Sequence, residues 1–337
     1  MDDVWTVDVW RQIHQVFPNV NTGSRILLTT RNVEVARHAE PWIPTHELHL
    51  LNDTQSLELF RRKAFPPNED IPAELKNWPG SLQRGVVDFL LHLVVLGGLL
   101  SRNEHSYDMW SKVARSMSWR SSGEGQECLS ILGLSYDDLP YRLKPCFLYI
   151  TAFPEDSIIS VSKLVRLWIA EGFILQEQRQ TMEDTAGDWL DELVQRCMIQ
   201  VVERSVARGR VKSIRIHDML RDFGESEARK DGFLRVCSSD DIDMAISDGI
   251  PSHRAAFHDR INGNSSPHLR TLLGLRLVLK DSDAVGRFLN GLELLRVLDL
   301  EDAADLEKLP KQMGNMIHLR YLGLRRTGLK RRDYHPP

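Results

Sequence analysis

A leucine pattern that returns after 24 residues is the feature that most constrains how this chain folds. The two copies share the spacing L-x-x-L-x-x-L-x-L and consist of Leu292, Leu295, Leu298 and Leu300, followed by Met316, Leu319, Leu322 and Leu324. This period is typical of leucine-rich repeats, in which each repeat adds a strand and stacks on its neighbours. A weaker copy lies at Leu269 and Leu272. Two leucine-rich helical faces are the alternative interpretation. Since about three repeats are needed for a self-supporting stack, we expect the start of a solenoid that is cut short.

Near the other end of the chain, the stretch TGSRILLTTR at 22–31 predicts a turn followed by a buried strand. Its short apolar run, residues 26–28, suits a central parallel strand better than an alternating edge strand. Thr29, Thr30 and Arg31 then fall at the carboxyl end of the strand, where open α/β sheets bind their ligands.

Helix signals follow in the middle of the chain. Asp53 and Thr54 are predicted to cap a helix that Pro66 and Pro67 end, and the polar residues 101–127 are predicted to form a loop. A second helix is predicted over 160–171, between an N-cap at Ser160 and a stop at Gly172.

A third predicted helix opens at Thr181 and Asp184 and carries apolar positions as far as Cys197. A hairpin is predicted next, with arms at 201–202 and 211–216 and a turn near Gly209. Two helices followed by a hairpin are typical of a winged-helix unit.

Composition narrows the class of protein. The chain has 337 residues, which suggests two or three domains, and its formal net charge of −4 does not favour binding to DNA or to an anionic membrane. None of its four cysteines forms a C-x-x-C pair, which fits a reducing compartment and argues against a disulfide scaffold or a cysteine-rich zinc site. The start MDDVWTVDVW lacks the basic residues of a secretion signal. The longest apolar run, 86–100, is shorter than the roughly 20 residues of a membrane span, so we expect a cytoplasmic protein.

Several longer strings occur in a characteristic order. They are DDVW, GSRILLTTR, LHLLNDTQSLELFRRKAF, LVVLGGLLS, CFLYITAFPEDSIISVSKLVRLWIAEGFI, IHDMLRDF and LRVLDLE. This series resembles the plant immune receptors that combine a nucleotide-binding (NB-ARC) domain with leucine-rich repeats, and LWIAEGFI resembles their coiled-coil class. The resemblance spans essentially the whole chain.

The resemblance implies a multi-domain α/β + α fold. Residues 1–65 are expected to form part of a P-loop NTPase-type domain with a partial parallel sheet, and residues 66–127 a small helical domain. Residues 128–235 would form the winged-helix domain, and residues 236–337 a linker with the first leucine-rich repeats. In this family the domains form an ADP/ATP-controlled switch in pathogen sensing rather than a metabolic enzyme.

The resemblance also assigns roles to residues. Asp2 and Asp3 match the acid pair that holds Mg²⁺, and Arg31 matches the arginine that reads the terminal phosphate, a task that suits its planar fork. His217 and Asp218 match the Met-His-Asp motif, whose histidine contacts the phosphate of ADP. Without the family context, the two acids and Arg31 would be solvated surface residues, and His217 with Asp218 would cap the next helix.

Two parts of the family pattern are missing. No string G-x-x-x-x-G-K-[ST], the P-loop that cradles phosphates, occurs in the sequence. We therefore expect nucleotide affinity to be reduced or lost, and the remaining sheet to expose an unpaired flank. Residues 74–92 lack the Gly-Leu-Pro-Leu motif, which a local frameshift of two bases would explain.

Three functions remain open. The first is a truncated immune receptor that takes part in defence against pathogens, with ADP or ATP and Mg²⁺ as the family's ligands. The second is a nucleotide-free interaction or decoy module. Under both, the expected partners are proteins: a pathogen effector, a guarded host protein or other receptor chains. The third is a DNA-binding winged helix, suggested by basic residues of the hairpin: Arg204, Arg208, Arg210, Lys212 and Arg215.

Overall fold

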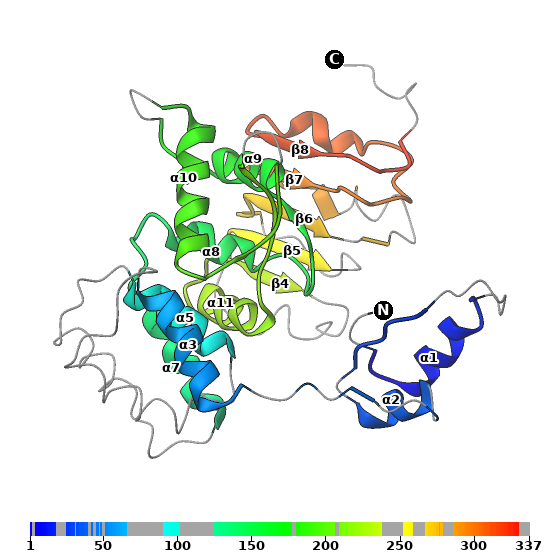
Figure 1. Ribbon diagram of the computed structural model, residues 1–337. Helices are drawn as coiled ribbons and strands as arrows, with labels where there is room; N and C mark the ends of the chain where they lie inside the picture. Colours follow the sequence, from blue (N-terminus) through cyan, green and yellow to red (C-terminus); the bar gives the residue numbers. More distant parts are fainter. Residues whose placement is uncertain are drawn as a thin grey trace. The chain divides into compact units, whose positions relative to one another are not determined.

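The chain forms two compact units, Met1–Leu51 and Asn52–Pro337 (Figure 1). The structure is a computed structural model that describes residues 1, 4–17, 25–30, 32–39, 42, 45–46, 48, 51–65, 90–101, 124–176, 180–205, 209–237, 252–258, 267–275, 277–278, 286 and 288–329. Asp2, Asp3, Arg31 and the atypical residues 74–89 therefore lie outside the described residues.

Two extended segments lie side by side in the first unit. The amino group of Met1 donates to the carbonyl of Leu27 at 2.7 Å, and the Thr29 amide donates to the Met1 carbonyl at 3.0 Å. Met1 therefore bonds to two residues of the other segment, Leu27 and Thr29, which is the hydrogen-bond pattern of parallel strands. Each segment leads into a helix, α1 (Val7–His14) or α2 (Val33–Ala39).

The apolar run of the second segment is less buried than the sequence predicts. Leu28 packs against a small core of Val4, Trp10 and Val35, whereas Ile26 is 44% exposed and Leu27 is 80% exposed. Side chains alternate along an extended segment, so Leu27 points away from that core, and the described residues of the unit do not cover it. The prediction of a buried strand is wrong for these two side chains.

The second unit begins with a helix that is capped one residue earlier than predicted. Helix α3 (Asp53–Ala64) starts from Asn52, whose side chain accepts from the Gln55 amide at 2.9 Å while Gln55 Oε1 accepts from the Asn52 amide at 3.0 Å. This reciprocal capping box satisfies two backbone donors at the start of the helix.

Helix α3 packs against α5 (Leu90–Leu100), which in turn packs against α7 (Glu124–Asp137). The first contact is close because Gly97 has no side chain: a Cβ there would lie 2.5 Å from Lys63 Cβ. Since α7 starts at Glu124, the predicted loop over 101–127 is wrong for its last residues, while 102–123 lie outside the described residues.

The winged-helix prediction is confirmed. Its elements are α8 (Lys144–Ile150), β1 (Ile159–Ser160), α9 (Val161–Glu171), α10 (Met182–Gln195), β2 (Gln200–Arg204), β3 (Val211–Arg215) and α11 (Asp218–Lys230). The strands form an antiparallel sheet in the order β1-β3-β2. Helix α9 ends at Gly172, which is left-handed with a φ of 82°, and Thr181 caps α10 by accepting from the Asp184 amide at 3.1 Å. Cys197 lies beyond the end of α10, not on it as predicted, and has a φ of 58°.

The last third forms a five-stranded parallel sheet, as a stack of leucine-rich repeats requires. Its order is β4 (Arg235–Cys237), β5 (Arg254–His258), β6 (Thr271–Leu275), β7 (Val297–Asp299) and β8 (Tyr321–Gly323). Leu298 pairs with Leu322, so the register of β7 and β8 reproduces the 24-residue period of the sequence. A short 3-10 helix, η3 (Lys311–Asn315), joins these two strands.

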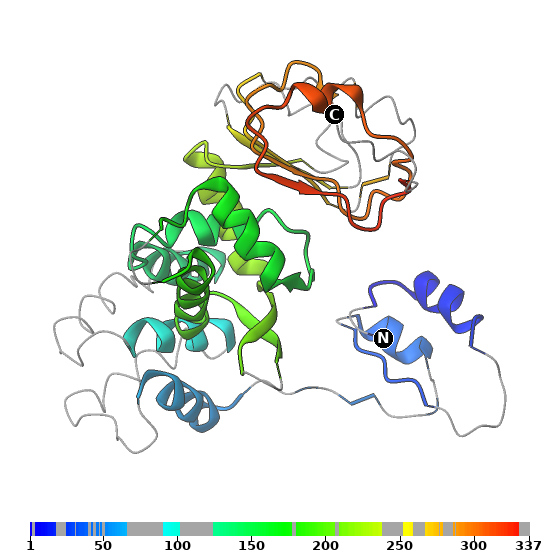
Figure 2. The same ribbon diagram turned by 90° about the horizontal axis from the view of Figure 1, so that it is seen from above.

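Strands β6 and β7 of this sheet are buried on both faces, whereas Leu322 of the edge strand β8 is 38% exposed. The face of Leu272 and Leu298 packs into the core of the repeats, together with the other leucines of the first complete copy. The face of Leu273 and Val297 packs into the core of the winged-helix region, because α9 lies against β7 and β8. Figure 2 shows the green helices of that region on one side of the yellow-to-red sheet and η3 on the other.

The fold class is therefore confirmed: the chain is a mixed α/β protein with helices, a winged-helix domain and parallel strands. The five-stranded parallel sheet spans residues 235–323, whereas the described residues of the first unit contribute two hydrogen-bonded extended segments. The four domain bounds expected from the sequence stay predictions.

Candidate functional site

Thr29 and Thr30 lie where the second extended segment of the first unit ends. The Thr29 carbonyl accepts from the Val4 amide at 3.0 Å. The Thr30 hydroxyl donates to the Val4 carbonyl at 2.5 Å and accepts from the Asn32 amide at 3.0 Å. Both threonines therefore hold the two segments together and lead into α2. Since Thr30 already uses its hydroxyl in this way, the side chain acts first as a structural link.

His217 and Asp218 lie at the start of α11. His217 is the N-cap residue, and its Nδ1 accepts from the Met219 amide at 3.4 Å. Asp218 is the first helical residue, where its negative charge suits the helix dipole. The alternative that His217 caps a helix is therefore confirmed. With Nδ1 as acceptor, the ring proton lies on Nε2, which can donate to an anion.

Acidic side chains surround this helix start. Burial raises the pKa of Glu155, and the nearby carboxylates of Asp218 and Asp156 raise it further. Arg221 supplies positive charge, but it contacts Asp222 at 2.9 Å and donates to the Phe153 carbonyl at 3.1 Å. These carboxylates would repel a polyphosphate bound at His217, unless Mg²⁺ or a further arginine neutralised part of the charge.

The residues predicted to bind nucleotide thus belong to different units of the chain. Thr29 and Thr30 belong to the first unit and His217 and Asp218 to the second, while Asp2, Asp3 and Arg31 lie outside the described residues. Among the described residues, no group of His, Cys, Asp or Glu side chains is arranged to hold a metal ion.

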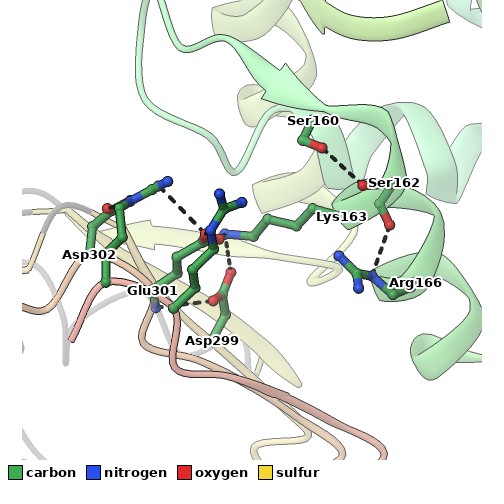
Figure 3. A network of polar contacts seen from close by, with 9 residues as sticks. Ser160, Ser162, Lys163, Arg166, Asp299, Glu301 and Asp302 are labelled. Carbon is green, nitrogen blue, oxygen red and sulfur yellow. Dashed lines mark hydrogen bonds and ion pairs between the residues drawn. The ribbon is translucent and has the colours of Figure 1, made fainter. Parts of the chain in front are cut away.

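A buried charged cluster joins α9 to the repeat sheet, and sequence reasoning missed it. Lys163, in the first turn of α9, places its Nζ 2.6 Å from Asp299 Oδ2 and 2.7 Å from Glu301 Oε2 (Figure 3). The Asp299 side chain is fully buried. Gly323, opposite Asp299 on β8, leaves the room, since a Cβ there would overlap the Asp299 carboxyl. We call Lys163, Asp299 and Glu301 the α9 cluster.

Burial and neighbouring charges act on this cluster in a definite way. Burial raises the pKa of Asp299, and the attraction of Lys163 offsets this only in part. Burial disfavours the charge of Lys163, but the carboxylates of Asp299 and Glu301 outweigh it and raise the pKa of the lysine.

A second buried ion pair fastens the other end of α9. Glu171, the last residue of the helix, accepts from Arg254 Nε of β5 at 2.9 Å and from the Thr271 hydroxyl of β6. The Arg254 guanidinium also lies over the rings of Phe233 and Phe173, 4.4 and 5.2 Å from their centroids. Lys163 and Glu171 are two helical turns apart, so both ends of one helical face are anchored to the sheet.

The sequence contains one signal that points to this contact. In the string LRVLDLE, Asp299 stands between two core leucines, at a strand position that faces away from the repeat core. A strand face exposed to solvent would also carry an acid at this position. The sequence therefore does not tell a solvated Asp299 from one buried under α9, and only the packing of α9 does.

The basic hairpin is less cationic than its sequence suggests. Lys212 contacts Glu203 at 2.7 Å, and Arg210 contacts Asp184 at 3.5 Å. Arg215 donates to Gln200 at 2.9 Å, while Arg208 lies outside the described residues. These pairings weaken the basis for a DNA-binding wing. None of the helices in the described ranges has the length and apolar character needed to cross a membrane.

Comparison with known domain families gives two matches. Residues 1–70 match the NB-ARC domain, and residues 152–223 match the winged-helix domain of disease resistance proteins. The second match covers β1 to the middle of α11 and includes His217, Asp218 and Lys163.

Similar proteins come from plants. The putative disease resistance RPP13-like protein 3 of Arabidopsis thaliana is 34% identical over 97% of this chain. The putative disease resistance protein At1g50180 of the same plant is 34% identical over 98%. The late blight resistance protein R1-A of Solanum demissum is 31% identical over 95%. The chain spans 39% of the length of each Arabidopsis protein and 26% of the Solanum protein.

Proposed function

We propose that this chain is part of an intracellular immune receptor. The premise is its match to the NB-ARC domain and to the winged-helix domain of disease resistance proteins. In this proposal the chain belongs to a switch that ADP and ATP control and that leads to defence against a pathogen. The observation that carries the proposal is the order of the matched segments: NB-ARC at 1–70, winged helix at 152–223, then a sheet of leucine-rich repeats.

His217 is the described residue that best suits a contact with nucleotide. Its Nδ1 is engaged by the Met219 amide, which leaves Nε2–H as a donor at the start of a 13-residue helix. The N-terminus of a helix also attracts negative charge. In our proposal Nε2 donates to a phosphate of ADP, Arg31 pairs with a terminal phosphate, and Asp2 with Asp3 would hold Mg²⁺.

We propose that the affinity of this chain for nucleotide is weak. The sequence has no P-loop string, so the backbone amides and the lysine that normally cradle the phosphates are missing from it. The acidic side chains around His217 add repulsion towards phosphate.

The experiment is to purify the full chain, denature it and measure the ADP that is released. We expect much less than one ADP per chain. Near-stoichiometric ADP would contradict weak binding and would support an intact nucleotide site. A folded, soluble chain without ADP would favour a nucleotide-free module that pairs with other receptor chains.

Two substitutions separate the roles of His217. His217→Ala removes both the cap and the imidazole, and we expect the free energy of unfolding to fall by about 1 kcal/mol. His217→Ser keeps an N-cap acceptor, so its stability should return close to that of the wild-type protein. Binding of ADP, measured by calorimetry at high protein concentration, should be weaker in both variants. If His217→Ser binds ADP as the wild-type chain does, the histidine does not contact the phosphate.

The interaction module is the second candidate, because one specific observation favours it. The winged-helix region and the repeats share a hydrophobic core and two buried ion-pair groups, and these contacts form without any nucleotide. For this candidate we propose protein partners, either receptor chains or the molecules that they guard.

A further inference from the structure

The α9 cluster contains more buried acid than buried base. The single ammonium group of Lys163 lies within 2.7 Å of two carboxylates, those of Asp299 and Glu301. The side chains of the three residues are 14%, 0% and 11% exposed. The neighbouring buried pair, Glu171 with Arg254, is balanced. Within the described part of the chain, one negative charge of the cluster therefore has no buried cation to match it.

Other charged or titratable groups surround the cluster on every element that packs there. They are Arg166 and Glu171 of α9, Tyr149 of α8, Arg254 of β5, Asp302 after β7, Tyr321 of β8, and Arg325 and Arg326 after β8. The two tyrosines stay neutral, because burial raises the pKa of Tyr321 to about 12 and that of Tyr149 well above its ordinary value.

Among the described residues, two of the remaining cations approach the acids of the cluster. Arg326 and Arg325 lie 3.5 and 3.9 Å from Glu301 Oε1, and their side chains are mostly in solvent. Arg326 also donates two hydrogen bonds to Asp302, one of them from Nη2 to Oδ2 at 2.8 Å. Both arginines act on Glu301, so Asp299 depends on Lys163 alone among the cations that contact it in the described residues.

We propose that docking of α9 onto the repeat sheet takes up a proton at the α9 cluster, so that acidification strengthens the contact between the winged helix and the repeats. A proton on Asp299 leaves Lys163 and Glu301 as a balanced pair and removes the unmatched buried charge. When α9 is detached, Asp299 is a strand residue that faces solvent, where its pKa takes an ordinary value of about 3.9.

The direction of the pH effect follows from the two pKa values of the carboxyl group. Burial gives Asp299 a higher pKa in the docked state than in the detached state. The docked state therefore binds more protons, and its stability rises as the pH falls through the docked value, until both states are protonated below about pH 4. The raised pKa of Lys163 acts in the same sense, because its contribution is lost only in strongly alkaline solution.

The first test is thermal unfolding of the full chain between pH 5 and pH 8, for the wild-type protein and for Asp299→Asn. Asparagine resembles the protonated carboxyl in shape and carries no charge. At pH 8 we expect the variant to melt about 2 °C or more above the wild-type protein, and we expect this gap to narrow as the pH falls. A gap that does not change with pH, of either sign, would overturn the proposal.

Asp302→Asn is the control with the opposite sign. Asp302 is bound by Arg326, which lowers the pKa of that carboxyl. Such a group stabilises the native state at neutral pH and loses this effect in acid. The control should therefore melt below the wild-type protein by the same amount at pH 5 and at pH 8, because the Asp302 carboxyl loses its stabilising effect only below about pH 3.9.

A second measurement needs no variant that might fail to fold. The carboxyl carbon of Asp299, observed by NMR in the selectively labelled wild-type chain, should titrate with a midpoint above about 3.9. A midpoint at or below that value would mean that Lys163 holds Asp299 ionised, and the proposal would be wrong.

Discussion

Individual residues matter in this chain according to where tertiary packing places them. Lys163 and Lys212 each lie within 2.7 Å of a carboxylate, so their pair distances are nearly equal. Lys163 is buried between α9 and the sheet with a side chain that is 14% exposed, whereas Lys212 lies on the hairpin with 63% exposed. Solvent screens an exposed pair, while a buried acid that loses its partner keeps an uncompensated charge.

Replacing each lysine by methionine tests this difference. Lys163→Met should lower the free energy of unfolding by about 3 kcal/mol, because it leaves two buried acids without their shared cation. Lys212→Met should cost less than about 1 kcal/mol. Urea denaturation followed by circular dichroism measures both. Equal losses in the two variants would show that burial does not govern the strength of the α9 cluster.

At the scale of helices and strands, local chemistry explains most of what the sequence predicts correctly. The stops and caps at Gly172 and Thr181 depend on neighbours within four residues, and both are found as predicted. The sequence predicts the cap of α3 at the wrong residue, because Asn52, Asp53 and Thr54 are all residue types that can cap a helix. The choice of Asn52 depends on its reciprocal hydrogen bonds with Gln55.

Glycines within helices cannot be interpreted from local sequence in the same way. Gly98 in α5 and Gly187 in α10 both occupy helix interiors. A Cβ on Gly98 would lie 2.8 Å from the Arg196 carbonyl oxygen, whereas a Cβ on Gly187 would meet no atom within 4 Å.

Alanine at these two glycines should therefore have opposite effects. Gly98→Ala forces two backbones apart and should lower the free energy of unfolding by about 1–3 kcal/mol. Gly187→Ala should raise it by about 0.5–1 kcal/mol, because alanine favours the helix and nothing obstructs it. Thermal and urea unfolding of both variants decide the matter, and a loss of stability in Gly187→Ala would contradict the open space around that position.

At the scale of the whole second unit, one sheet serves two hydrophobic cores. Leu272 and Leu273 are adjacent and fully buried, yet Leu272 packs with the repeats and Leu273 with the winged-helix region. The strand face that repeat proteins commonly offer to partners is, over β6 to β8, covered by part of the same chain. Any partner of these strands would have to bind elsewhere or displace α9.

Truncation of each leucine should separate the two cores. Leu272→Ala and Leu273→Ala should each cost about 2–5 kcal/mol, since each leaves a cavity in a packed interior. Hydrogen exchange should become faster in α9 only for Leu273→Ala, and faster in the strands for both. If Leu272→Ala loosens α9 to the same extent, the two faces act as one cooperative core.

The sequence by itself determined the repeat, the winged helix and the family resemblance, because periodic leucines, caps and hairpin turns are short-range signals. It also supplied His217 as a candidate, and the structure adds that this histidine is the N-cap of α11. Tertiary structure alone decided that Asp299 meets Lys163, 136 positions earlier in the chain, and that Ile26 and Leu27 stay exposed. The physical reason is that burial and charge pairing depend on which surfaces of the folded chain meet. A strand position that faces away from its own core has the same sequence signal whether water or a helix covers it.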